Sequence, residues 1–168
     1  MSALDPPNLH DTGAEAYLFS CNSLVTGLGP FHPSPDQISC LWQTFEEGVD
    51  PVIKMLHTPS IRPQIAKFKE RLDCMNRPFE ALMFAIYFAA VTSITEEQCQ
   101  ASLDMDKTSL LKKYRFATQQ ALARSGFLSA DNVVALQALV IFLVRQNLAS
   151  FNFNKHLADQ VVDMRTES

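Results

Sequence analysis

Asp104 and Asp106 are the most closely spaced aspartates in this chain of 168 residues. Clustered aspartates on a helix can hold Mg²⁺ around a diphosphate, which is the chemistry that such a pair suggests first. Two acids alone make a poor magnesium site, because the ion needs several oxygen ligands. Both residues also lie beside an expected helix start, where aspartate is common as a capping residue. We therefore predict that this pair binds no metal.

The histidines and cysteines also lack the spacing of a metal or nucleophilic site. No two histidines lie four residues apart, as a helical zinc site requires; they are His10, His32, His57 and His156. The cysteines are too widely spaced for a zinc knuckle or a redox motif; they are Cys21, Cys40, Cys74 and Cys99. We expect the cysteines to be free thiols in a reducing intracellular compartment. We expect His57 to lie at the end of a helix.

The sequence contains no Gly-rich phosphate loop and no nucleophile elbow. It therefore predicts no catalytic, cofactor-binding or metal-binding residue, no cofactor and no enzymatic activity. The formal net charge is −4, whereas domains that hold nucleic acid by its phosphates are usually basic. The densest basic cluster, Lys112–Arg115, is expected to be the solvated face of a helix. We predict no DNA-binding residue in this chain.

Two apolar runs, Ala81–Val91 and Val133–Val144, dominate the second half of the chain, and only Gln137 interrupts the second run. A membrane-spanning helix needs about 18 or more apolar residues, so both runs are better read as buried helices. Charged residues make up 19% of the chain, below the quarter that is usual in globular domains. This composition suggests too little polar surface to cover all the apolar faces.

Capping signals and apolar spacing divide the chain into helices. Ser34 and Gln37 form a capping box at the first clear helix, which ends at Gly48. A second helix is expected to start at Thr58, and a third to cover 79–93. A second capping box at 95–98 starts the next helix, which is followed by a helix over 106–125 with Gly126 at its end. The last expected helix is capped by Ser129. No segment shows the alternation of a strand. The predicted fold is all-α, an irregular multi-helix bundle of about six helices.

These elements divide the chain into three parts. Residues 1–33 are expected to form a loosely ordered N-terminal arm, because they carry Pro, Gly, Asn and Ser between short apolar pieces. Residues 34–149 form the predicted helical domain. Residues 150–168 form a tail with weak periodicity.

The segment 32–61 resembles the start of the fungal-specific transcription factor domain. This domain is the middle homology region of fungal regulators that carry a six-cysteine, two-zinc DNA-binding cluster. The residues that match its pattern are Leu41, Trp42, Phe45, Glu47, Val49, Asp50, Pro51, Lys54, Leu56, His57 and Pro59. The segments 79–99, 110–128 and 135–143 are similar to three further blocks of the family in the same order. The resemblance covers about Phe31 to Val144.

The resemblance implies an all-helical regulatory domain, a nuclear location and control of transcription. Many members of this family control metabolic or secondary-metabolite gene clusters. The chain departs from the family in three ways. The six-cysteine cluster is missing, Gly48 stands where the family has Asn, and the family's later helices do not follow Val144. We therefore expect the front half of a regulatory domain, an incomplete domain that reaches DNA only indirectly or through a missing zinc-cluster domain.

An incomplete domain should expose apolar helix faces, through which homo- or hetero-oligomers can form. We expect neither a membrane nor a small-molecule substrate as a partner. Three alternatives stay open. In the first, the chain is a non-functional truncated product. In the second, it is a helical protein-interaction module that acts on a full-length regulator. In the third, it is a small helical binding module or enzyme with a similar core.

Overall fold

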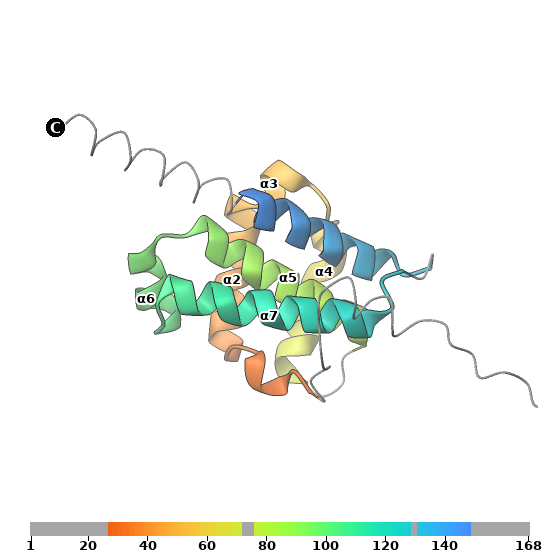
Figure 1. Ribbon diagram of the computed structural model, residues 1–168, viewed down its shortest axis with the longest axis horizontal. Helices are drawn as coiled ribbons and strands as arrows, with labels where there is room; N and C mark the ends of the chain where they lie inside the picture. The colour runs from red at the N-terminus through yellow and green to blue at the C-terminus, as the bar shows by residue number, and fades with distance from the viewer. Residues whose placement is uncertain (1–26, 72–75, 129–130, 149–168) are drawn as a thin grey trace, which may run out of the picture.

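The computed structural model describes residues 27–71, 76–128 and 131–148 (Figure 1). Within these ranges every regular element is a helix, so the predicted all-α class is confirmed. The elements are η1 (Gly29–Phe31), α2 (Pro35–Gly48), α3 (Asp50–Ile53), α4 (Thr58–Glu70), α5 (Arg77–Ser93), α6 (Glu96–Leu103) and α7 (Lys107–Ser125). A further helix, here called the last helix, covers 133–148. Residues 1–26 of the predicted arm and the predicted tail lie outside the described residues.

The helix starts follow the capping signals of the sequence. The side chains of Ser34 and Gln37 each accept a hydrogen bond from the other residue's backbone N–H at the start of α2. Thr95 and Gln98 form the same reciprocal pair at α6. Ser129, the expected cap of the last helix, lies outside the described residues. The first turn of this helix is capped by Asn132, whose Oδ1 accepts a hydrogen bond from the N–H of Ala135 at 3.2 Å.

The short helix α3 follows α2 almost directly. Pro51 stands in its first turn, where the absent N–H of proline has no intrahelical partner to lose. Lys54 then ends the helix in the left-handed conformation, with φ of 50°. Asp50 and Pro51 therefore begin α3, and the single residue Val49 separates it from α2.

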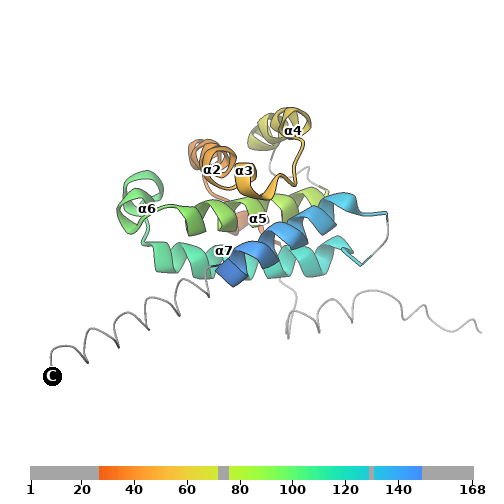
Figure 2. The same cartoon turned by 90° about the horizontal axis from the view of Figure 1, so that it is seen from above.

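α5 is the central helix of the bundle. All of its residues from Ala81 to Val91 are buried. Figure 2 shows α5 between α2 and α4 on one side and α7 with the last helix on the other. A helix that is apolar on every side needs neighbours around it, and this arrangement supplies them. The reading of Ala81–Val91 as a buried helix is therefore confirmed.

Aromatic side chains connect α5 to its neighbours. The rings of Tyr87 and Tyr114 join α5 to α7, with centroids 5.5 Å apart. The rings of Phe88 and Phe142 join α5 to the last helix at 5.2 Å. Such pairs add to the burial of apolar area that drives packing. The last helix therefore packs against the core through one face.

The N-terminal described segment also packs on the bundle. Leu28 is buried, and the ring of Phe31 lies 5.6 Å from that of Phe116 on α7. Met83 is buried in the core, whereas Met105 is not. Met105 is exposed because it lies in the turn between α6 and α7.

Candidate functional site

The last helix has a buried face and an exposed apolar face. The buried face consists of Ala135, Ala138, Ile141 and Phe142. The exposed face carries large apolar side chains with 37–62% of their surface exposed; these are Val133, Leu136, Val140, Leu143, Val144 and Leu148. We call these six residues the outer stripe. Among the described residues, the other exposed large apolar side chains are scattered over α3, α7 and loops.

Three hydrogen bonds fix which face of the last helix points outward. Gln137 Nε2 donates to the carbonyl of Met55 at 2.9 Å, and Arg145 Nε donates to Thr92 Oγ1 at 2.9 Å. Asn132 Nδ2 donates to the carbonyl of Ser125 at 2.8 Å. These bonds join the helix to α7, to the end of α5 and to the segment after α3. Because they prevent rotation of the helix, the outer stripe is held toward solvent.

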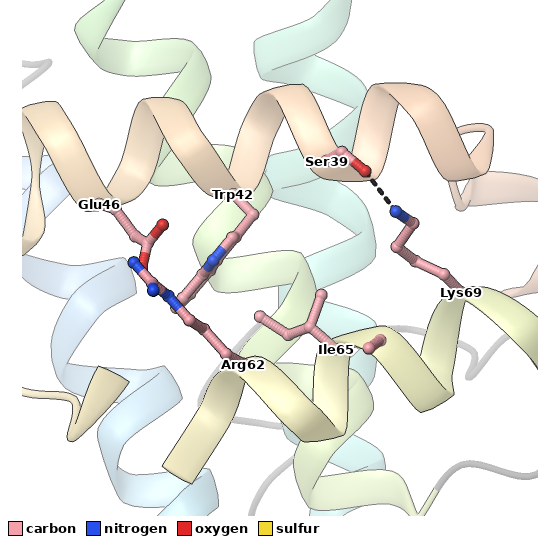
Figure 3. Close-up of a pocket in the computed structure, with 7 residues that line it drawn as sticks. Ser39, Trp42, Glu46, Arg62, Ile65 and Lys69 are labelled. Atoms are coloured by element: carbon pink, nitrogen blue, oxygen red, sulfur yellow. Dashed lines mark hydrogen bonds and ion pairs between the residues drawn. The ribbon is translucent and has the colours of Figure 1, made fainter. Parts of the chain in front are cut away.

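A shallow groove lies between α2 and α4, and its residues point toward one another (Figure 3). Its floor is made of Trp42, Ile65 and Ala66. At one end Arg62 forms an ion pair with Glu46 at 2.8 Å. At the other end Lys69 Nζ donates to the hydroxyl of Ser39. These two polar contacts join the helices on either side of Trp42, which is itself buried as a core residue.

The residues that suggested metal chemistry act as helix caps. Asp104 is the left-handed C-cap of α6. Asp106 is the N-cap of α7, and its Oδ2 accepts a hydrogen bond from the N–H of Ser109 at 2.8 Å. The bond from Ser109 lowers the pKa of the Asp106 carboxyl. In the described ranges, no three His, Cys, Asp or Glu side chains gather closely enough to hold a metal ion.

His57 was expected at the end of a helix, but it is the residue directly before α4, and its Nδ1 is 2.7 Å from the hydroxyl of Ser60. Cys40 and Cys99 are free thiols, and burial raises the pKa of the Cys99 thiol. Cys21 and Cys74 lie outside the described residues.

None of the helices in the described part of the chain has both the length and the apolar character needed to cross a bilayer.

Sequence reasoning missed the buried position of His32. Only 2% of its side chain is exposed, and its ring stacks on Phe84 with centroids 4.3 Å apart. Its Nε2 lies 3.6 Å from a carboxylate oxygen of Glu80. The contacts anchor the chain on α5 just before α2 begins. A lone histidine in a Pro-rich segment gives no periodic signal, so only the packing shows this role.

Curated proteins similar to this chain are fungal transcription regulators. The transcriptional regulator nsrM of Aspergillus novofumigatus is 34% identical over 141 residues, which are 84% of this chain and 20% of nsrM. The C6 finger domain transcription factor nscR of Aspergillus fumigatus is 31% identical over 148 residues, 85% of this chain and 19% of nscR. This chain is homologous to fungal C6 zinc-cluster transcription factors. The resemblance inferred from the motifs is thereby confirmed.

The homologous region is a small part of these zinc-cluster factors. The pyriculol/pyriculariol biosynthesis cluster transcription factor 1 of Pyricularia oryzae is 32% identical over 126 residues, 75% of this chain and 16% of that protein. The chain thus spans about one fifth or less of the curated relatives that it matches. No family model matches the chain. No solved structure is similar to it at a significant level.

Proposed function

We propose that this chain is part of the regulatory region of a fungal zinc-cluster transcription factor and acts in the nucleus. Its relatives support this role, because they are named as transcription regulators. Two of them are named for single biosynthetic gene clusters, those of pyriculol/pyriculariol and aurofusarin. We infer that the target here is also a secondary-metabolite gene cluster.

The proposed mode of action is contact with another polypeptide. The outer stripe is the observation that carries this proposal, since six large apolar side chains share one exposed helix face. Burial of such a face against a partner is favourable by roughly 25 cal/mol per Å² of apolar surface. The hydrogen bonds of Gln137 and Arg145 keep this face of the helix exposed to solvent, where a partner can contact it. A net charge of −4 disfavours direct contact with phosphates.

A non-catalytic role agrees with the placement of the polar groups. Asp106 caps a helix, Glu46 and Arg62 pair with each other, and His57 bonds to a neighbouring hydroxyl. Each of these contacts serves helix ends or helix pairing. We therefore infer that the chain regulates by binding another polypeptide.

Deletion of the gene, followed by sequencing of all transcripts, tests this function. The expected result is a change of at least several-fold in the transcripts of one contiguous set of biosynthetic genes, which reintroduction of the gene reverses. Fluorescent tagging should place the protein in the nucleus. Unchanged transcripts under conditions that express the gene would support the alternative of a non-functional product and contradict the proposal.

A further inference from the structure

The groove between α2 and α4 is framed by a polar contact at each end. Ser39 and Glu46 are two helical turns apart on α2, and their partners Lys69 and Arg62 have the same spacing on α4. Two turns of helix span about 10 Å, so the contacts enclose a stretch of groove of that length. The groove has a volume of about 300 Å³, which is at the lower end of the range for small-molecule sites.

Trp42 gives the groove an aromatic floor with an unused hydrogen-bond donor. Trp42 and Ile65 lie between the two end contacts (Figure 3). The indole is mostly buried, and its N–H has no hydrogen-bond acceptor among the described residues. Small-molecule sites combine such an apolar lining with a few polar groups that fix orientation. A shallow floor of this kind suits a flat ring system that carries oxygen.

Lys69 places a positive charge without a counter-ion at one end of the groove. Its Nζ donates to the neutral hydroxyl of Ser39, and that hydroxyl donates its own proton to the carbonyl of Pro35. The ion pairs of the described residues do not include Lys69. An ammonium group carries further N–H donors, so Lys69 can bind a carboxylate while it keeps its contact with Ser39. This end of the groove is therefore suited to an anion.

The opposite end can both donate and accept a hydrogen bond. Arg62 directs Nε and one terminal nitrogen to a single oxygen of Glu46, each at 2.8 Å. The other terminal nitrogen and the second carboxylate oxygen take no part in this ion pair. A hydroxyl group can donate to that oxygen and accept from that nitrogen. This end therefore suits an uncharged hydroxyl better than a second anion, because Glu46 already neutralises Arg62.

We propose that the groove binds an aromatic hydroxy acid, with the carboxylate on Lys69, the ring on Trp42 and the hydroxyl at the Arg62–Glu46 pair. A ligand that contacts both ends joins α2 to α4. Figure 2 shows these two helices on one side of α5 and the last helix on the other. The groove is therefore separate from the outer stripe, and this ligand site goes beyond the proposed function.

NMR titration of the full 168-residue chain with 6-hydroxy-2-naphthoic acid tests the proposal, because this compound carries its two polar groups at opposite ends of a flat ring system. Trp42 is the only tryptophan, so its indole N–H gives a single side-chain signal. That signal should shift to saturation, with a dissociation constant below about 1 mM. 2-Naphthol lacks the carboxylate and should bind roughly tenfold more weakly. An indole signal that does not shift, or equal affinity for the two compounds, overturns the proposal.

Two lysines of α4 provide a matched pair of variants. Lys69→Met removes the charge but keeps a long side chain, so it should weaken the binding of the hydroxy acid roughly tenfold and leave that of 2-naphthol unchanged. Lys67→Met removes the same charge from an exposed residue outside the groove, and should change either affinity by less than about twofold. Equal effects of the two substitutions would show that net charge, and not the groove, attracts the anion, which overturns the proposal.

Ala66→Leu tests the location of the ligand by filling the groove. Ala66 lines the groove and is exposed, so the larger side chain needs no rearrangement of the core. Circular dichroism should show the same helix content as in the wild-type chain. The substitution should abolish the shift of the Trp42 signal. Binding that survives Ala66→Leu places the ligand elsewhere and overturns the proposal.

Discussion

The side chain of Gln137 donates a hydrogen bond to the carbonyl of Met55 at 2.9 Å, across 82 positions of sequence. Gln137 is the only polar residue in the apolar run Val133–Val144. Its bond fixes the rotation of the last helix, so that Phe142 packs on Phe88 and Leu136 points to solvent. One amide in an apolar run therefore determines which apolar residues are core and which are surface.

Replacement of Gln137 by leucine should lower the free energy of unfolding by about 1–2 kcal/mol. The physical reason is that the Met55 carbonyl loses its donor while the site stays half-buried. Urea denaturation followed by circular dichroism measures the change. Gln43→Leu is the matched control, because Gln43 is exposed and bonds only within α2 to Glu47; its effect should stay within about 0.5 kcal/mol. Equal effects of the two substitutions would contradict the role assigned to Gln137.

Tyr87 should tolerate the loss of its hydroxyl. The hydroxyl is buried and has no hydrogen-bond partner among the described residues, and burial raises the pKa of Tyr87 well above its usual value. Tyr87→Phe should therefore leave stability unchanged or raise it by up to about 1 kcal/mol. Tyr87→Ala should cost about 3–5 kcal/mol, because it opens a cavity in the core. A loss above 1 kcal/mol in Tyr87→Phe, measured by thermal or urea unfolding, would reveal a partner for the hydroxyl.

The helix ends could be predicted from sequence because capping is local. The boxes at Ser34 and Thr95 and the glycine at Gly126 each signal their role within four residues. Ser129, the expected cap of the last helix, lies outside the described residues, and the cap that the structure describes is Asn132, directly before the first helical turn. A Ser and an Asn are both good caps, so the pattern alone could not choose between them.

The candidate surface was predictable only in part. Low charge content and the family resemblance indicated exposed apolar helix faces, but a run such as Val133–Val144 does not show which of its residues face outward. That choice depends on contacts from distant segments, those of Gln137 with Met55 and of Arg145 with Thr92. The burial of His32 likewise depends on Phe84 and Glu80, which are about 50 residues away.

Asp106 should make a pH-dependent contribution to stability. Hydrogen bonds from Ser109 lower its pKa from 3.8 in the folded state, so the contribution is present above the unfolded pKa and is lost as the pH falls through the folded pKa. Asp106→Asn keeps a capping side chain but cannot titrate. The urea midpoints of wild type and variant should therefore differ most at pH values above 3.8 and converge as the pH falls through the lowered pKa of the folded state. A difference that stays constant with pH would contradict the capping role of the charged carboxylate.

Two glycines should respond oppositely to alanine. Gly126 ends α7 with φ of 66°, a conformation that alanine adopts only with strain. Gly126→Ala should cost about 1 kcal/mol of unfolding free energy. Gly48 stands in the last turn of α2, and an added Cβ would meet Ser93 at an ordinary 3.5 Å. Gly48→Ala should be neutral or stabilise by up to about 1 kcal/mol, so loss of stability in Gly48→Ala would show that the turn before Val49 needs glycine.

Complementation of a deletion strain tests the central claim most directly, namely that the chain regulates transcription through the outer stripe. The strain receives wild type, Leu143→Asp or Leu128→Asp at equal protein levels, and the transcripts of the affected gene cluster are counted. Leu128→Asp is the matched control, because Leu128 is a similarly exposed leucine outside the last helix. Our account predicts that wild type and Leu128→Asp restore the transcript pattern and that Leu143→Asp does not. Full restoration by Leu143→Asp would contradict it.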